Sequence, residues 1–202
     1  MSARPLAAML GLLHRLALSE RGAAAVEFAL ILPVLLFIYV GTLEASALIS
    51  MDRKVQSVSG AIGDLVARSE VSLTSSQMRD YFRAAGGIMT PYSSAPVEQV
   101  VTAISVSSDG ETSVLWSRQY HGGEYEDGVF VEGTYEVGEE YSPGDSYPLP
   151  EEMIAIALDS TVIAAQASYS YTPLFGIVID QAVNLHRSSY FMPRFGGSIA
   201  LN

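Results

Sequence analysis

The longest apolar stretch of the chain runs from Ala23 to Leu43 and contains one charged residue, Glu27. The sixteen residues between Glu27 and the next acid, Glu44, carry no charge. Sixteen helical residues rise about 24 Å, which is short of the roughly 20 residues that cross a bilayer. The span must therefore include residues 23–26 as well. The pattern predicts one membrane-spanning helix with an acid inside its leading edge.

Helical spacing continues beyond this stretch. The apolar positions recur at steps of three and four residues: Leu48, Met51, Val55, Val58, Ile62 and Leu65. Ser59 falls off this stripe, and Gly60 and Gly63 interrupt it. Such a stripe gives a helix one buried face. We expect a single helix from about Ala23 to Ser69, roughly 70 Å long, with its first half in lipid and its second half under a globular domain.

The next segment predicts a short helix. Thr74 and Gln77 have the spacing of a capping box, in which the side chain of each residue bonds the backbone of the other. We expect the helix to cover residues 75–85 and to stop at Gly86 and Gly87.

Residues 98–202 read mainly as strands. Asp109 and Gly110 separate two alternating segments and predict a hairpin turn. Gly122 to Pro150 reads as a long excursion with at most one short strand, at 128–132. The four longer segments with strand character are 98–108, 112–121, 160–173 and 182–193. The expected fold class is α+β: a long N-terminal transmembrane helix continues into a stalk, and a small antiparallel sheet of about four strands follows within residues 70–202.

Charge is unevenly distributed along the chain. Residues 1–22 hold three arginines and one glutamate, whereas residues 98–160 hold fourteen acids and one arginine. The basic front should stay in the cytoplasm, which places the domain across the membrane. The acidic domain would repel phosphates, so we expect no nucleic-acid partner. The chain has no cysteine, which excludes disulfides and thiol chemistry.

Glu27 requires an explanation, because an ionised side chain in the bilayer costs about 2.5–3.5 kcal/mol on insertion scales. A cut after Gly22 would give Ala23 a new α-amine, one helical turn from Glu27. The amine of one copy could then pair with Glu27 of a neighbour. Such a pair would neutralise both charges in lipid and fix the register between subunits.

The residues around this position resemble a known family. "RGAAAVEF", from Arg21 to Phe28, is similar to a prepilin peptidase site. The longer string "RGAAAVEFALILPVLLFIYVGTLEAS" resembles the TadE-like proteins of the Tad (tight adherence, Flp) type IV pilus, including a "G-x-x-E" at Gly41 to Glu44. Two later segments, "ASYSYTPLFG" (167–176) and "LHRSSYFMPR" (185–194), are similar to closing segments of that family.

The resemblance implies a minor pilin or pseudopilin. Residues 1–22 would be a leader that an inner-membrane prepilin peptidase removes between Gly22 and Ala23. Residues 23–69 would form the transmembrane and stalk helix, and the remaining domain would be periplasmic or carried on an extracellular pilus. The implied partners are the membrane, the prepilin peptidase, and major and minor pilins or other Tad assembly proteins. Glu27 and Phe28 would serve in subunit pairing and assembly.

Other interpretations of the apolar stretch remain open. The Ala45–Ser46–Ala47 sequence has the small-x-small form of a signal peptidase site. Cleavage after Ala47 would release a soluble periplasmic binding module. An uncut single-pass anchor is a third possibility. Within the span, Pro33 predicts a kink or local unwinding of the helix.

No catalytic constellation is evident, so we expect no enzyme, no cofactor and no metal site. His121 and His186 lack metal-type spacing and read as surface or sheet residues. The acids of the excursion could supply oxygen ligands to calcium, but they lack a twelve-residue loop pattern. A solvated acidic rim, or a patch for a basic partner, is the favoured interpretation. Those acids are Glu124, Glu126, Asp127, Glu132, Glu136, Glu139, Glu140 and Asp145.

Overall fold

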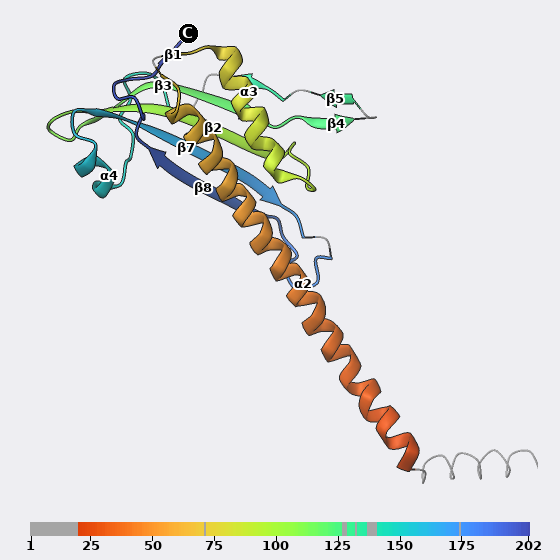
Figure 1. Cartoon of the computed structure of the whole chain (residues 1–202). Coiled ribbons are helices and arrows are strands. Elements are labelled where there is room, and N and C mark those ends of the chain that lie inside the picture. The colour runs from red at the N-terminus through yellow and green to blue at the C-terminus, as the bar shows by residue number, and fades with distance from the viewer. Residues whose placement is uncertain (1–19, 71, 127–128, 132, 137–140, 174) are drawn as a thin grey trace, which may run out of the picture.

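The computed structural model describes residues 20–70, 72–126, 129–131, 133–136, 141–173 and 175–202 (Figure 1). Residues 1–19, which hold most of the expected leader, lie outside the described residues. Several acids of the excursion lie outside them too: Asp127, Glu132, Glu139 and Glu140.

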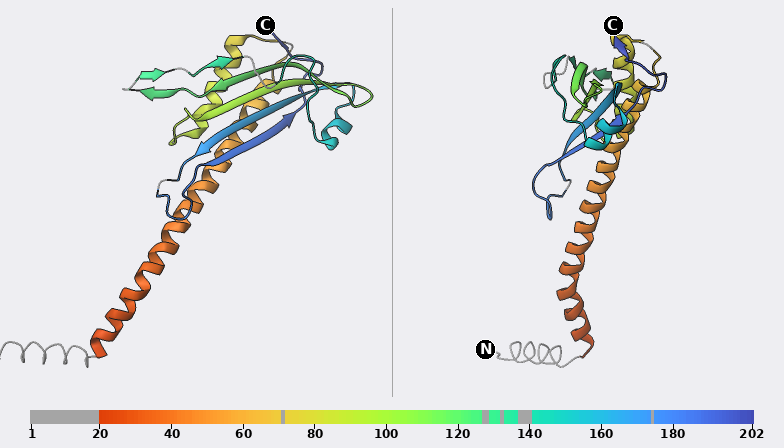
Figure 2. Two further views of the ribbon diagram at one scale, coloured as in Figure 1. Left: turned by 180° about the vertical axis from the view of Figure 1, so that it is seen from behind. Right: turned by 90° about the vertical axis from the view of Figure 1, so that its left-hand side faces the viewer.

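One helix dominates the molecule. The α2 helix runs from Glu20 to Ala67 over 48 residues, which corresponds to a length of about 72 Å. It begins three residues earlier and ends two residues earlier than the sequence predicts. Its N-terminal half projects away from the rest of the chain, and its C-terminal half lies against the sheet (Figures 1 and 2). A long N-terminal helix that continues into a packed stalk is therefore confirmed.

An antiparallel sheet of five strands forms the centre of the domain. Its order is β6-β3-β2-β7-β8, and every neighbouring pair is antiparallel. The four long strands correspond to the four expected segments. The fifth, β6, pairs only Gln119 and Tyr120 of β3 with two residues of the excursion, which has too little alternation to reveal a strand. The bounds are β2 Val97–Val106, β3 Thr112–His121, β6 Tyr135–Glu136, β7 Ser160–Tyr171 and β8 Val183–Phe191.

Smaller elements complete the domain. The short strand expected at 128–132 is β5, Val129–Val131, and it pairs with β4, Glu124–Glu126, as a separate hairpin. Strand β1, Ser72–Leu73, pairs in parallel with β9, Ala200–Leu201, and ties the C-terminus to the end of the long helix. A short helix, α4, covers Glu151–Ile156.

The capping box is present as expected. Helix α3 covers Ser75–Gly86, and a 3-10 turn, η1, follows at Gly87–Met89. The Thr74 side chain accepts a hydrogen bond from the Gln77 backbone N–H at 3.2 Å, and the Gln77 side chain accepts one from the Thr74 N–H at 3.0 Å. These two bonds satisfy donors that the first helical turn leaves unpaired.

The main core lies between helices α2 and α3 and one face of the sheet. Met51, Val55, Val58 and Ile62 of the predicted stripe are buried there, together with Phe82 of α3. The opposite face of the sheet is covered by the 141–157 segment, whose buried members include Tyr147, Leu149 and Ala157. Helices cover one face and a loop with α4 covers the other, so the fold is α+β.

The structure corrects two details of the stripe. Ser59, which the spacing placed outside it, is fully buried and shares a 3.0 Å hydrogen bond with Ser189 of β8. The packing requires a glycine at position 63. A Cβ at this position would collide with the Phe191 ring and lie 3.0 Å from the Ala165 Cβ. The glycine therefore allows α2 to approach the sheet closely.

Candidate functional site

The N-terminal half of α2 is apolar and uncovered. Every residue from Gly22 to Tyr39 is exposed, including Phe28 at 59% and Leu30 at 72%. Within the described residues, α2 is the helix that is long and apolar enough to cross a membrane. A contiguous exposed surface of this kind is unfavourable in water and indicates a nonaqueous or protein environment. The helix therefore fits a single-pass membrane anchor.

The predicted processing site lies at the start of this helix. Gly22 and Ala23 fall within the first turn of α2, and Glu27 is one turn further along, four residues after Ala23. Residues four apart share a helix face. The structure gives Glu27 no hydrogen bond or ion pair to another described residue, and its side chain is exposed. Its carboxylate is thus open to a group from outside the described chain.

The Gly22–Ala23 bond is helical here, whereas a peptidase requires an extended strand. Opening the first turn is easier at glycine, which is about 1 kcal/mol less favourable in a helix than alanine. Helix α2 also continues on both sides of Pro33. The kink at Pro33 and the roles of Gly22, Ala23, Glu27 and Phe28 stay predictions.

The acid that directly follows the apolar stretch, Glu44, has a role that the sequence did not reveal. Glu44 is 97% buried, since its exposed fraction is 3%. Its carboxylate accepts backbone N–H groups from Ile177 at 3.1 Å, Val178 at 3.0 Å and Ile179 at 3.2 Å. Consecutive N–H groups that converge on one anion form a nest, and hydrogen bonds to a charged acceptor are among the stronger ones. We call this arrangement the Glu44 clamp.

Two features shape the loop that the clamp holds. Gly176 has a φ of +61°, a conformation that other residues rarely adopt, and it turns the chain toward α2. Val178 then lies against Gly41, with its Cγ2 atom 3.2 Å from the position of a Cβ on that glycine. The Gly41-x-x-Glu44 pattern was visible in the sequence, but its partner is more than 130 residues away.

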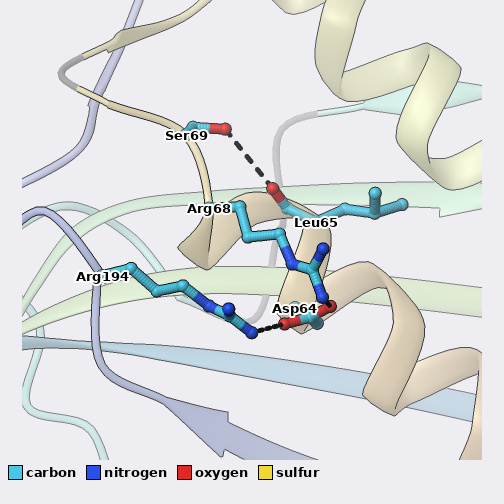
Figure 3. A network of polar contacts seen from close by, with 5 residues as sticks. All are labelled: Asp64, Leu65, Arg68, Ser69 and Arg194. Carbon is cyan, nitrogen blue, oxygen red and sulfur yellow. Dashed lines mark hydrogen bonds and ion pairs between the residues drawn. The ribbon is translucent and has the colours of Figure 1, made fainter.

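A second link joins the C-terminal part of α2 to the chain after β8 (Figure 3). Asp64 forms ion pairs with Arg68 and Arg194, each at 2.6 Å. The Arg194 backbone N–H also donates to the Ala67 carbonyl at 2.9 Å, which satisfies an acceptor at the helix end. Hydrogen bonds from Arg68, and then from Arg194, hold the pKa of Asp64 below its ordinary value.

Residues 167–176 and 185–194 both lead to contacts with α2. The first segment leads into the loop that the Glu44 clamp holds, and the second ends at the Asp64 ion pairs. The two links are twenty helical residues apart, about 30 Å along the axis. Together they fix the sheet to the helix at both ends of their contact.

The remaining candidates for chemistry are weaker. Among the described residues, no group of three or more His, Asp or Glu side chains could hold a metal ion. His186 is exposed on β8 and shares hydrogen bonds with Ser168 at 2.9 Å and Ser188 at 3.2 Å, as a surface sheet residue would. An open pocket of about 690 Å³ lies between α3 and residues 90–94 and 122–123. Its lining offers no nucleophile with an adjacent base.

Comparison with known proteins supports one assignment. The model of the TadE-like protein family matches residues 22–61, which is 40 of the 202 residues. The matched stretch contains the uncovered half of α2, Glu27, Gly41 and Glu44. A search of curated proteins and a search of solved structures each found no match. Residues 22–61 are thus similar to the TadE-like family, which confirms the resemblance inferred for the N-terminal stretch. The similarity of residues 167–176 and 185–194 to closing segments of that family stays a prediction.

Proposed function

We propose that this protein is a pilin-like component of a Tad (type IVb) pilus that acts as a minor pilin or as a primer of pilus assembly. It would be inserted in the inner membrane by α2, with residues 1–22 in the cytoplasm before processing and the sheet domain in the periplasm. Its role would be structural, since neither the family match nor the described side chains point to a reaction.

The division of α2 into two halves supports this proposal most directly. One continuous helix presents an uncovered apolar surface over residues 22–39 and then, from Met51 to Val66, packs into the core of a folded domain. A subunit of this form can move its first half from lipid into a bundle of similar helices without altering its domain. The family match covers the same helix.

Processing would create the second functional feature. A prepilin peptidase would cut between Gly22 and Ala23, and the new α-amine would lie one turn from Glu27. In an isolated subunit, the α-amine and the Glu27 carboxylate would both remain poorly solvated in lipid. In a filament, the amine of one subunit could approach Glu27 of another, and each charge would gain a partner in a medium of low dielectric constant.

The alternative, release after Ala47, has less support. Residues 45–47 lie inside the continuous helix α2, and a cut there would remove Glu44. The backbone N–H groups of residues 177–179 would then lose their acceptor. Fractionation separates the two outcomes, because a released module would leave cells on osmotic shock whereas the anchored protein would stay with membranes.

The decisive experiment is the N-terminal mass of the protein isolated from cells with active prepilin peptidase. We expect a chain that begins at Ala23. Gly22→Ala should block this cleavage, because the added Cβ obstructs the extended approach that the peptidase needs. Gly60→Ala is a matched control on the same helix, where a Cβ would meet nothing within 4 Å. A protein that retains Met1 despite active peptidase would overturn the proposal.

A further inference from the structure

The loop between β7 and β8 exposes three large apolar side chains. Within residues 175–180, which we call the clamped loop, Phe175 is 52% exposed, Ile177 is 55% exposed and Val178 is 49% exposed. The loop carries one charge, Asp180, at its end. Apolar side chains gathered on one surface loop indicate a contact with another apolar phase.

The position of the loop identifies that phase. Val178 contacts Gly41, and Gly41 lies inside the apolar stretch Ala23–Leu43 that would cross the bilayer. The loop therefore reaches the level of the last helical turn of the span. In three views, the β7–β8 connection is the part of the domain that extends furthest along α2 toward its uncovered half (Figures 1 and 2).

Three backbone N–H groups of the loop are already paired within the protein. A loop at membrane depth is tolerated only when its polar groups have partners within the protein. The N–H groups of Ile177, Val178 and Ile179 all have such a partner, because the Glu44 carboxylate accepts their hydrogen bonds. The same contacts give the buried Glu44 charge its donors. Asp180, which is exposed, limits the depth to the headgroup boundary.

We propose that Phe175, Ile177 and Val178 insert into the interfacial region of the bilayer beside α2, on the side of the membrane that carries the sheet domain. The inference rests on the proposed membrane insertion of α2. The loop and the helix would then contact the membrane at two points. Two contacts restrict the tilt of the helix and the height of the domain, which a single helix leaves free.

The absence of cysteine from the sequence makes a direct test possible. The full chain with Ile177→Cys would carry an environment-sensitive fluorophore and be reconstituted in phosphatidylcholine vesicles that contain nitroxides both near the top and near the end of the acyl chains. Leu35→Cys, in the middle of the span, is the control for insertion of α2. Ser108→Cys, exposed at the far end of the sheet, is the control for a position in water. Phe175→Cys provides a second probe of the loop.

The expected result is strong quenching at positions 35, 177 and 175, several-fold above that at 108. Strong quenching at 35 with quenching at 177 and 175 no greater than at 108 would overturn the inference and leave the loop to water or to a protein partner. Absence of quenching at 35 would refute the insertion of α2 in the membrane. It would then also refute the proposed contact of the loop with the bilayer. Unchanged thermal melting of each labelled protein confirms that the fold is intact.

Discussion

The Glu44 carboxylate accepts a hydrogen bond from the backbone N–H of Val178 at 3.0 Å, although 134 residues separate the two positions. This bond joins the end of the apolar stretch to the connection between the last two long strands. It makes Glu44, which directly follows the apolar stretch of α2, part of the folded domain. The domain should therefore respond to changes at a position that the sequence alone assigns to the membrane boundary.

Removal of the Glu44 side chain should release the clamped loop. In Glu44→Ala, the three N–H groups of residues 177–179 lose their acceptor, so their hydrogen exchange should accelerate while amides of β2 stay protected. Glu44→Gln keeps one acceptor oxygen without the charge and should give an intermediate rate. Glu111→Ala, which removes an exposed acid far from the loop, is the control. Equal exchange in all variants would show that the clamp does not hold the loop.

Alanine substitutions at two glycines of α2 should have different effects on the stability of the domain. At Gly63 the added Cβ collides with Phe191, so Gly63→Ala should destabilise the domain by about 1–3 kcal/mol through overpacking. At Gly60 the space is open, and Gly60→Ala should be neutral or stabilise by up to about 1 kcal/mol because alanine favours the helix. Thermal unfolding in detergent measures both. A Gly63→Ala protein as stable as Gly60→Ala would contradict the close packing.

The two halves of α2 should differ in their contribution to domain stability. Ile62 is fully buried, and Ile62→Ala should cost about 2–5 kcal/mol, which lowers the melting temperature by roughly 5–20 °C for a chain of this size. Leu35 is 50% exposed and outside the core, so Leu35→Ala should leave the melting temperature of the domain unchanged. A large effect of Leu35→Ala would mean that the first half of the helix also packs on the domain.

Acid should loosen the link between α2 and Arg194. Because Arg68 and Arg194 lower the pKa of Asp64, ionised Asp64 stabilises the folded state. That contribution is complete above the ordinary aspartate pKa near 4 and is lost as the pH falls through the lowered value. The protection factor of the Arg194 amide, which compares its exchange with that of an unfolded chain at the same pH, should therefore fall below about pH 4. In Asp64→Asn the protection factor should already be low at pH 7 and depend less on acid.

Glu27 should matter for assembly rather than for insertion. We expect Glu27→Ala to remain in the membrane fraction, because it removes a charge from the apolar stretch. Incorporation into pili, or the priming of pili, should be lost, since the new N-terminal amine of the neighbour would have no partner in lipid. Immunoblots of sheared pili and of membranes measure the two steps. Normal incorporation of Glu27→Ala would show that the pairing role is wrong.

The sequence by itself determined the elements whose causes are local. The long helix follows from an apolar stretch and a stripe at steps of three and four residues, and α3 follows from the Thr74–Gln77 capping box. The hairpin at Asp109–Gly110 and the α+β class follow from turn chemistry and alternation. The match to the TadE-like family model also depends on contiguous residues, from Gly22 to Ala61.

Only the tertiary structure decided which distant residues meet. Glu44, Asp64 and Gly63 each have a partner more than 100 residues away: the 177–179 backbone, Arg194 and Phe191, respectively. Periodicity shows which face of a helix is buried, but it does not show what covers that face. The partners depend on how the β7–β8 hairpin docks on α2, and that docking is set by the packing of the whole sheet, which local sequence patterns do not encode.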